Sequence, residues 1–244
     1  MRWLAAATFT PLVMFAPAQV MAADLSVPSG PAVYAPVPAA AGWSGFYIGA
    51  NAGGGMSRAQ SEFSVAGATF ATADTDLWGP VGGVQAGYNW QSGALLVGVE
   101  TDFQWSNLKG SLGVQCPVCG PATNATIEHD IEWFGTARGR LGYTAGGWLA
   151  YVTGGYAYGR AGLNATATGG GVTATLSQSA VQSGWTLGAG TEIALAPHWS
   201  AKLEYLYVDF GTITNTIAVA GLPPVNDRTR LQMNVTRLGV NYRF

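Results

Sequence analysis

The order of short and long connections is the feature of this sequence that most limits how the chain can fold. From Trp43 onward, the chain contains about eight runs in which apolar and polar residues alternate, as in "RLGVNYRF" at its end. A period of two is typical of a strand with one apolar and one polar face. The runs lie near residues 44–54, 81–91, 94–106, 128–145, 148–161, 182–196, 199–211 and 231–244.

Connection length alternates along these runs. Three short connections follow even-numbered runs: "QSG" the second, "AGG" the fourth and "APH" the sixth. Long segments follow the odd-numbered runs, at residues 55–80, 107–127, 162–181 and 212–230. Barrels of the outer membrane sort their connections in this way, whereas a soluble β-sandwich has no reason to do so. We therefore predict an all-β fold for residues 43–244: a transmembrane antiparallel up-and-down β-barrel of eight strands, with short periplasmic turns and long extracellular loops.

Composition favours a membrane barrel over a soluble sheet protein. Only 10% of the residues are charged, against about 25% in a typical soluble domain, while 11% are aromatic. Beyond the N-terminus, no apolar run approaches the roughly 20 residues that a membrane helix needs. The net charge of −2 and the lack of a basic patch give no indication of nucleic acid binding.

The N-terminal residues predict export. Arg2 precedes a long apolar stretch that ends in "VMAA", a pattern typical of a cleaved signal peptide over residues 1–22. We expect cleavage after Ala22, with the bond after Ala23 as the alternative. A retained anchor helix is disfavoured by the two prolines within the stretch. Residues 23–42 are rich in Pro and Ala, which predicts an extended periplasmic tail.

Charged residues alternate with apolar ones in most of the runs. A Lys or Arg on the lipid face near the middle of the membrane costs about 2–4 kcal/mol, so we expect the charged set to line the lumen. These residues are Glu100, Asp102, Arg138, Arg140, Glu192, Lys202, Glu204, Arg237 and Arg243. Aromatic residues near the ends of the apolar faces would form the interfacial girdles. Examples are Trp133, Tyr143, Trp199 and Tyr242.

The fourth and fifth runs differ in how clearly their two faces can be assigned. In the fourth run, the alternation assigns Ile131 to the lipid face together with Trp133, and Glu132 to the lumen. The fifth run, "WLAYVTGGYAYGR", does not sort into two faces, so its orientation stays open.

The lumen has two interpretations. The interior of a barrel of about eight strands is only wide enough to be filled by side chains. Opposite charges in that space can bond to one another and form a structural plug, provided that all of them are satisfied. The alternative is a narrow pore for small solutes.

Several segments match a known family in order. "GWSGFYIGANAGGG", "WFGTARGRLGYT", "WTLGAGTEIALAPHWSAKLEYLYVDFG" and "LGVNYRF" resemble the small outer-membrane barrels of the OmpA/opacity superfamily, in particular the RopB-like proteins of alphaproteobacteria. The resemblance implies an abundant envelope protein and surface antigen in the outer membrane of a Gram-negative bacterium. Such a protein contacts lipid and lipopolysaccharide and is inserted by the outer-membrane assembly machinery. The resemblance also implies that Phe244, with Tyr242, is read as an insertion signal.

Two cysteines form "CPVC" in the second long segment. A structural zinc site needs about four ligands, and the chain has no second pair of cysteines. A thioredoxin-type redox motif would require a βαβ unit, which the pattern lacks. In an oxidising compartment we expect Cys116 and Cys119 to form a local disulfide.

Residues for catalysis are few. His129 and His198 are the only histidines, and Asp130 cannot easily orient His129 because adjacent residues on a strand point to opposite faces. We expect no enzyme, no cofactor and no metal. We expect a structural envelope barrel with antigenic surface loops; the alternative is a narrow porin for small solutes, and a loop-mediated adhesin or a barrel enzyme is less favoured.

Overall fold

The computed structural model describes residues 42–65, 68–115, 124–169, 172–217 and 225–244. The predicted signal peptide, its cleavage at Ala22 or Ala23 and the tail as far as residue 41 lie outside the described residues. So do Cys116 and Cys119.

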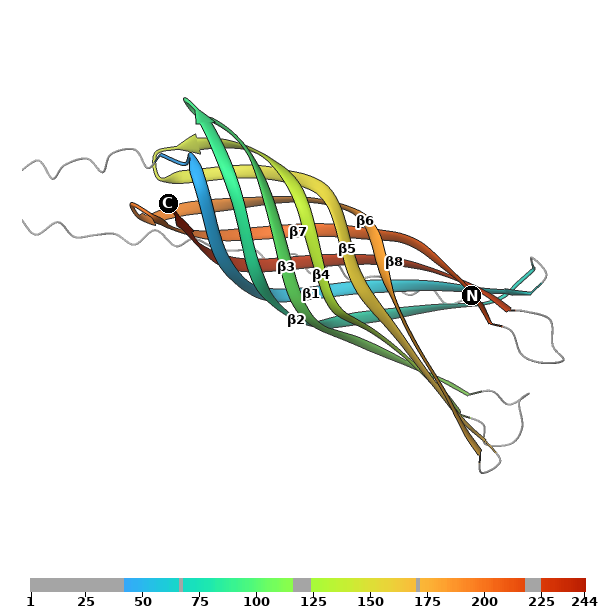
Figure 1. Ribbon diagram of the computed structural model, residues 1–244. Helices are drawn as coiled ribbons and strands as arrows, with labels where there is room; N and C mark the ends of the chain where they lie inside the picture. Colours follow the sequence, from blue (N-terminus) through green and yellow to red (C-terminus); the bar gives the residue numbers. More distant parts are fainter. Residues whose placement is uncertain (1–41, 66–67, 116–123, 170–171, 218–224) are drawn as a thin grey trace, which may run out of the picture. The chain divides into compact units, whose positions relative to one another are not determined.

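Eight strands follow one another around a closed antiparallel barrel (Figure 1). Each strand pairs with its neighbours in sequence, and the last strand returns to the first, from the pair Tyr47–Arg243 to the pair Val65–Val225. The predicted eight-stranded up-and-down barrel is therefore confirmed. The strands are β1 (Gly45–Val65), β2 (Ala68–Ser92), β3 (Leu95–Gln115), β4 (Asn124–Ala145), β5 (Trp148–Gly169), β6 (Val172–Ala196), β7 (Trp199–Ile217) and β8 (Val225–Arg243). In the described part of the chain, no helix is long and apolar enough to cross a membrane.

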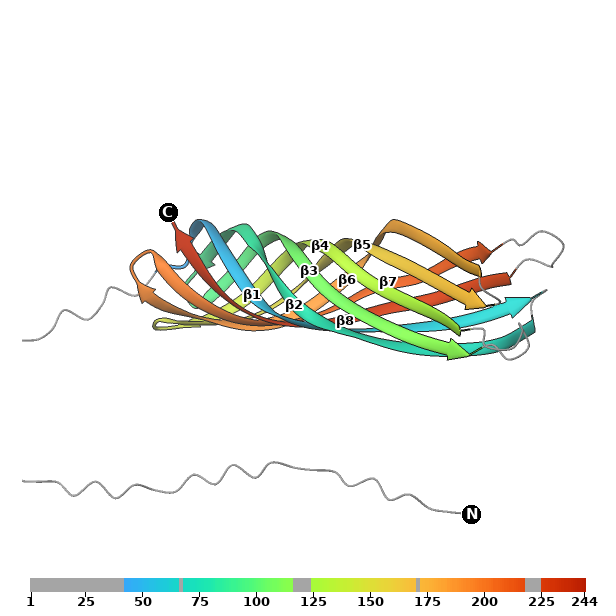
Figure 2. The same ribbon diagram turned by 90° about the horizontal axis from the view of Figure 1, so that it is seen from below.

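Three tight turns define one rim of the barrel, called here the turn rim. They join β2 to β3, β4 to β5 and β6 to β7, and the end of β8 lies at the same rim (Figure 2). Gly93 and Gly146 take up positive φ angles of 60° and 59° in the first two turns, a conformation that favours glycine. The short connections of the sequence are thus two-residue hairpins, typical of a periplasmic rim.

The strands extend much further at the opposite end than the sequence pattern predicts. β1 and β2 pair as far as Val65 and Ala68, so most of the predicted loop 55–80 is a β-ribbon. The other long segments are likewise largely strand. The prediction placed the strand ends too early, because alternation of polarity is required only where one face meets lipid. Backbone pairing continues in water without it.

One facing prediction in β4 is wrong. Ile131 is buried in the barrel, whereas Glu132 is exposed and pairs with Arg160 at 3.5 Å. The register between β4 and β5 shifts between Ile131 and Trp133, so Glu132 is the extra residue of a β-bulge. A bulge reverses the faces on one side of it, which the strict period of two cannot anticipate.

The fifth strand is apolar on both sides along much of its length. Leu149, Tyr151 and Ala157 point inward and are buried, while Trp148 and Val152 point outward. Polarity therefore does not alternate, which explains why the sequence left this strand unassigned.

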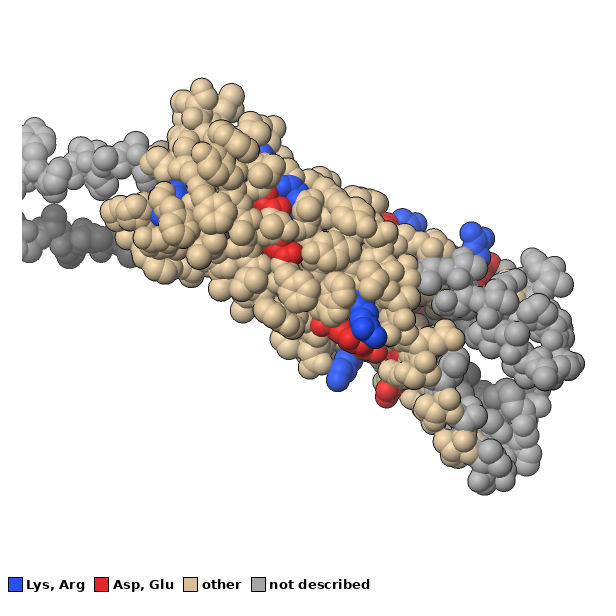
Figure 3. Space-filling model, in the orientation of Figure 1, with Lys and Arg blue, Asp and Glu red and all other residues tan. Residues whose placement is uncertain are grey.

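An apolar belt covers the outer face of the barrel. On β4, the rings of Tyr143 and Trp133 lie ten residues apart, close to the ~9–11 residues with which a tilted strand crosses a bilayer. The Lys and Arg side chains that stand out from the surface lie toward the end opposite the turn rim (Figure 3). The side chains of Arg58 on β1, Arg160 on β5 and Arg230 on β8 are each roughly half exposed.

Candidate functional site in the barrel interior

Eight charged side chains meet inside the barrel and form what we call the ion network. They come from five strands, and each residue is at most 3% exposed. The register places Glu100 opposite Arg138, Glu192 opposite Lys202 and Glu204 opposite Arg237. The members are Glu100 and Asp102 on β3, Arg138 and Arg140 on β4, Glu192 on β6, Lys202 and Glu204 on β7, and Arg237 on β8.

Arg138 and Arg237 join three carboxylates at the centre of the network. Arg138 donates through Nη2 to Asp102 Oδ2 at 2.8 Å and through Nη1 to Glu204 Oε1 at 3.1 Å, and it also contacts Glu100. Arg237 donates through Nη2 to Asp102 Oδ2 at 2.9 Å and through Nε to Glu204 Oε2 at 2.8 Å. Two arginines thus clamp the same pair of acids from different strands, an arrangement suited to the planar guanidinium.

Arg140 and Lys202 extend the network toward the turn rim. Arg140 Nη2 donates to Glu192 Oε1 at 2.6 Å, and its guanidinium carbon lies 4.0 Å from the centre of the Tyr151 ring. Lys202 Nζ donates to both oxygens of Glu100, at 3.0 and 3.1 Å. Every charge in the network therefore has an opposite charge within ion-pair distance.

The network is balanced as well as buried. Its four acids and four bases sum to zero. Burial of charge without such pairing costs several kcal/mol per ion, because the hydration of each ion is lost. Arg138 Nε, Arg140 Nε and Arg237 Nη1 have no acceptor among the described residues, so the satisfaction is extensive but not complete.

Two tyrosines hydrogen-bond to the network across glycines. Tyr47 lies opposite Gly87 and donates to Glu100 Oε2 at 2.7 Å. Tyr151 lies opposite Gly190 and donates to Glu204 Oε1 at 2.9 Å. A Cβ atom on Gly190 would lie 2.5 Å from Tyr151 Oη, so only glycine leaves room for the ring. The role of these tyrosines was not predicted from the sequence; the pattern that marks them is an inward aromatic residue facing a glycine on the neighbouring strand.

Arg243 is not part of the ion network. The sequence grouped it with the lumen charges, and it is indeed buried. However, it lies nearer the turn rim, where it stacks over the Trp43 ring at 4.9 Å and donates to Pro197 O at 3.2 Å. It forms no ion pair within the described part of the chain. The prediction that it joins the charge network is therefore corrected.

Apolar layers close the interior on both sides of the ion network. On the side of the turn rim, Trp43, Leu96, Leu149 and Tyr151 pack together as the turn-side layer. Beyond the network lies a larger outer layer, whose members include Phe134, Leu206, Val208, Met233 and Val235. The sequence analysis did not predict these layers. Their signal is a stretch in which both faces are apolar, such as "YLYV" at residues 205–208.

The C-terminal aromatic residues lie at the seam where the barrel closes. Phe244 N donates to Phe46 O at 3.0 Å, and the two rings lie 5.5 Å apart. The Tyr242 ring contacts those of Phe244 and Trp199, at 5.2 and 5.1 Å. These residues therefore hold the last strand to the first at the turn rim.

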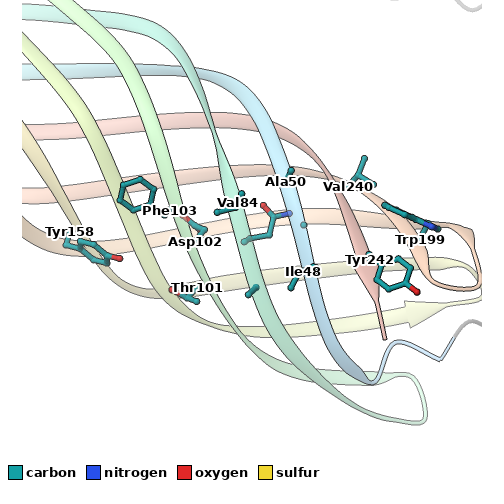
Figure 4. Close-up of a pocket in the computed structure, with 13 residues that line it drawn as sticks. Ile48, Ala50, Val84, Thr101, Asp102, Phe103, Tyr158, Trp199, Val240 and Tyr242 are labelled. Atoms are coloured by element: carbon teal, nitrogen blue, oxygen red, sulfur yellow. The ribbon is translucent and has the colours of Figure 1, made fainter.

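A shallow groove of about 640 Å³ crosses the outer face of β1, β2 and β3 (Figure 4). Small and apolar side chains line much of it, among them Ala50, Val84 and Phe103. Ala50 and Val84 point outward, so the groove belongs to the lipid-contact surface.

The two histidines do not form a catalytic arrangement with each other. His198 lies in the turn between β6 and β7, where Nδ1 is 2.8 Å from Arg243 O, whereas His129 lies on β4 toward the opposite end. Within the described residues, no group of three or more His, Cys, Asp and Glu side chains could hold a metal ion.

A closed antiparallel barrel with an apolar outer belt around a buried, charged interior is an integral outer-membrane β-barrel. Comparison with known families gives the more specific assignment. The chain belongs to the family described as outer membrane protein beta-barrel domain, whose model matches residues 25–244. It is therefore a protein of the outer membrane of a Gram-negative bacterium.

Two curated relatives support the assignment. The chain is 40% identical to the 31 kDa outer-membrane immunogenic protein of Brucella melitensis over 95% of each chain. It is 32% identical to a 22 kDa outer membrane protein of Rhizobium leguminosarum, over 72% of this chain and 68% of the relative. Among solved structures, the outer membrane protein OprG from Pseudomonas aeruginosa is 13% identical with a TM-score of 0.51, covering 82% of this chain and 97% of that one. The last likeness concerns the fold alone. The resemblance noted from the sequence is thus confirmed at the level of the family.

Proposed function

We propose that this protein is a sealed structural barrel of the outer membrane, without catalytic activity, whose extended strands and loops are displayed at the cell surface as antigen. The observation that carries the proposal is the balanced ion network between two apolar layers. A conducting lumen would need water along its length, whereas buried charges such as Glu204 and Arg237 bond directly to each other. The names of the Brucella relatives support the antigenic part.

Conductance measurements in a planar lipid bilayer test the sealed lumen. We expect no single-channel steps from the wild-type protein at neutral pH. A matched pair of variants, Arg138→Ala in the network and Arg160→Ala on the exposed surface, shows whether any current arises from the interior. Regular unitary steps from the wild-type protein, altered by Arg138→Ala alone, would establish the narrow porin instead.

The non-catalytic assignment depends on the absence of a catalytic cluster in the described residues and on the names of the relatives. A direct test uses refolded protein with a panel of ester, peptide and phospholipid substrates. Turnover that is lost in both His129→Ala and His198→Ala, but not in Arg160→Ala, would contradict the proposal.

We further propose that Tyr242 and Phe244 act as the signal that the outer-membrane assembly machinery reads. Phe244→Ala should lower the amount of inserted barrel while leaving the melting of inserted molecules nearly unchanged. Phe46→Ala is the matched control, because it removes the same ring contact at the seam but leaves the C-terminal residue intact. Equal insertion defects in the two variants would show that the ring pair, and not a terminal signal, is required.

Two processing events and the position of the tail complete the proposal. The signal peptide would be removed after Ala22, or after Ala23, and N-terminal sequencing of the mature protein distinguishes the two bonds. Residues 23–42 would form an extended tail in the periplasm. Cys116 and Cys119 would form a disulfide, which thiol labelling before and after reduction tests.

A further inference from the structure

Above the membrane the barrel divides into two sheets. Pairing between β2 and β3 extends outward only as far as Trp78 and Lys109, and pairing between β6 and β7 only as far as Trp185 and Asp209. All other neighbouring strands stay paired well beyond these points. One sheet therefore contains β7, β8, β1 and β2, and the other contains β3, β4, β5 and β6. Figure 1 shows the two sheets diverging.

The second seam opens because β7 turns away from β6. A register irregularity lies between Asp209 and Thr212, and Gly211 takes up a positive φ of 74° there. Asp209 Oδ1 accepts a hydrogen bond from Gly211 N at 2.7 Å and so holds the turn in place. The split is thus built into the sequence of β7.

The split leaves one edge of β6 without a partner strand among the described residues, from Val172 to Gly184. The opposite edge of the same segment pairs with β5 throughout. Residues 177–181 are all exposed, so both faces of the strand are open to solvent as well. An unpaired edge presents a row of backbone N–H and C=O groups that can hydrogen-bond to another strand.

This edge differs from the other free edges. Natural edge strands are usually protected by charges or proline, yet residues 161–191 contain no Asp, Glu, Lys, Arg or Pro. The free edge of β2, Ala68–Leu77, carries Asp74 and Asp76, and the shorter free edge of β3 begins beside Lys109. The free part of β7, beyond Asp209, is also shorter than that of β6. Among the described residues, the β6 edge is therefore the longest free edge, and it has no charge to prevent pairing.

We propose that the Val172–Gly184 edge of β6 binds an extended segment of a partner polypeptide outside the cell by strand addition. Only a polypeptide backbone supplies donors and acceptors at the spacing of the edge. The exposed side chains of the segment, such as Thr175, Ser177 and Val181, favour a partner with small hydroxyl or β-branched side chains. No ionic recognition is available, since the segment has no charge.

The β6 edge of a second copy in the same membrane does not fit this edge. If the β6 edges of two copies paired with each other, a twofold axis perpendicular to the strands would relate them, and the two β6 strands would run in opposite directions. Two copies inserted with the same orientation keep both β6 strands running from the outer end toward the turn rim. Pairing between two β6 edges is therefore excluded in one membrane, and we take the occupant to be a segment of a different polypeptide. This inference depends on the strand pairing and not on whether the lumen is sealed.

The test uses the refolded mature protein and a short fluorescent peptide of alternating threonine and valine. We expect the peptide to bind saturably. Binding should slow amide hydrogen exchange in Val172–Gly184 and leave the exchange in Ala68–Leu77 unchanged. The same peptide with N-methylated amides controls for hydrophobic adsorption and should not bind. Equal binding of the methylated peptide, or equal protection of the two segments, would overturn the proposal.

Two proline variants locate the interaction. Consecutive residues of a strand direct their N–H groups to opposite edges. Of the two variants Gln178→Pro and Ser179→Pro, one therefore removes an N–H group from the free edge, and the other removes an N–H group that faces β5. The free-edge variant should keep the β5–β6 amides protected and lose peptide affinity about tenfold or more. Retained affinity in both variants would refute the proposal. A concentration-dependent dimer that the free-edge variant abolishes would show that the occupant is a second copy.

Discussion

Removal of Arg138 should destabilise the barrel more than removal of any exposed arginine. Its side chain is completely buried and contacts Glu100, Asp102 and Glu204. Arg138→Ala would leave four buried acids facing three bases, together with a cavity that the alanine cannot fill. The carboxylates cannot regain water, because the apolar layers close the interior on both sides.

The magnitude follows from this geometry. Breaking a buried ion pair by deleting one partner costs about 3–5 kcal/mol. In a chain of this size, each kcal/mol shifts the melting temperature by about 2–4 °C, so the expected fall is about 6–20 °C. The exposed pair of Arg160 with Glu132, at 3.5 Å, should contribute only about 0–1 kcal/mol.

The assay is heat modifiability on a gel, checked by circular dichroism of the refolded barrel. Arg138→Ala and Arg160→Ala are compared with the wild-type protein at the same lipid composition. A further variant, Arg138→Met with Glu100→Gln, removes one acid and one base and so restores neutrality. It should recover most of the lost stability, because replacing a whole buried pair is often close to neutral.

Two results would refute this reasoning. If Arg138→Ala and Arg160→Ala have the same melting temperature, the ion network is hydrated and contributes little to the stability of the barrel. If the double variant is no more stable than Arg138→Ala alone, the loss comes from packing and not from uncompensated charge.

Two further predictions follow from the structure. Gly190→Ala should move the Tyr151 ring and lower stability by about 1–3 kcal/mol, whereas Gly139→Ala, where the nearest atom to a new Cβ is 3.9 Å away, should melt like the wild-type protein. Both are measured by thermal unfolding, and equal melting of the two variants would contradict the proposed fit. A cysteine replacing Asp74 should be labelled on intact cells by an impermeant reagent, whereas one replacing Gly146 should be labelled only after the membrane is broken; the reverse pattern would invert the barrel.

The facing of most charged residues could be predicted from the sequence. Glu204, for example, lies between outward Leu203 and Tyr205, and the cost of charge in lipid then decides which side is inside. The alternation of polar and apolar residues is a property of each strand by itself. It therefore gives the direction of a side chain but not its partner.

The partners depend on how neighbouring strands are offset. Arg138 lies opposite Glu100 because of the register between β3 and β4, which no local pattern encodes. A single bulge at Glu132 reverses the faces next to it, and the apolar interior of β5 removes the polarity signal altogether. Arg243 has the correct facing but lies too near the rim to reach an acid. The sequence thus predicts the strands and the facing of their side chains better than it predicts which side chains pair inside the barrel.

The position of Arg237 on the final strand has a consequence for biogenesis. Without β8 in place, the barrel holds four carboxylates with only three basic partners, and its first strand has an open edge. Closure therefore neutralises the interior and completes the ladder in one event. A chain truncated before β8 would therefore have both defects at once, an unbalanced buried carboxylate and an unpaired edge on β1.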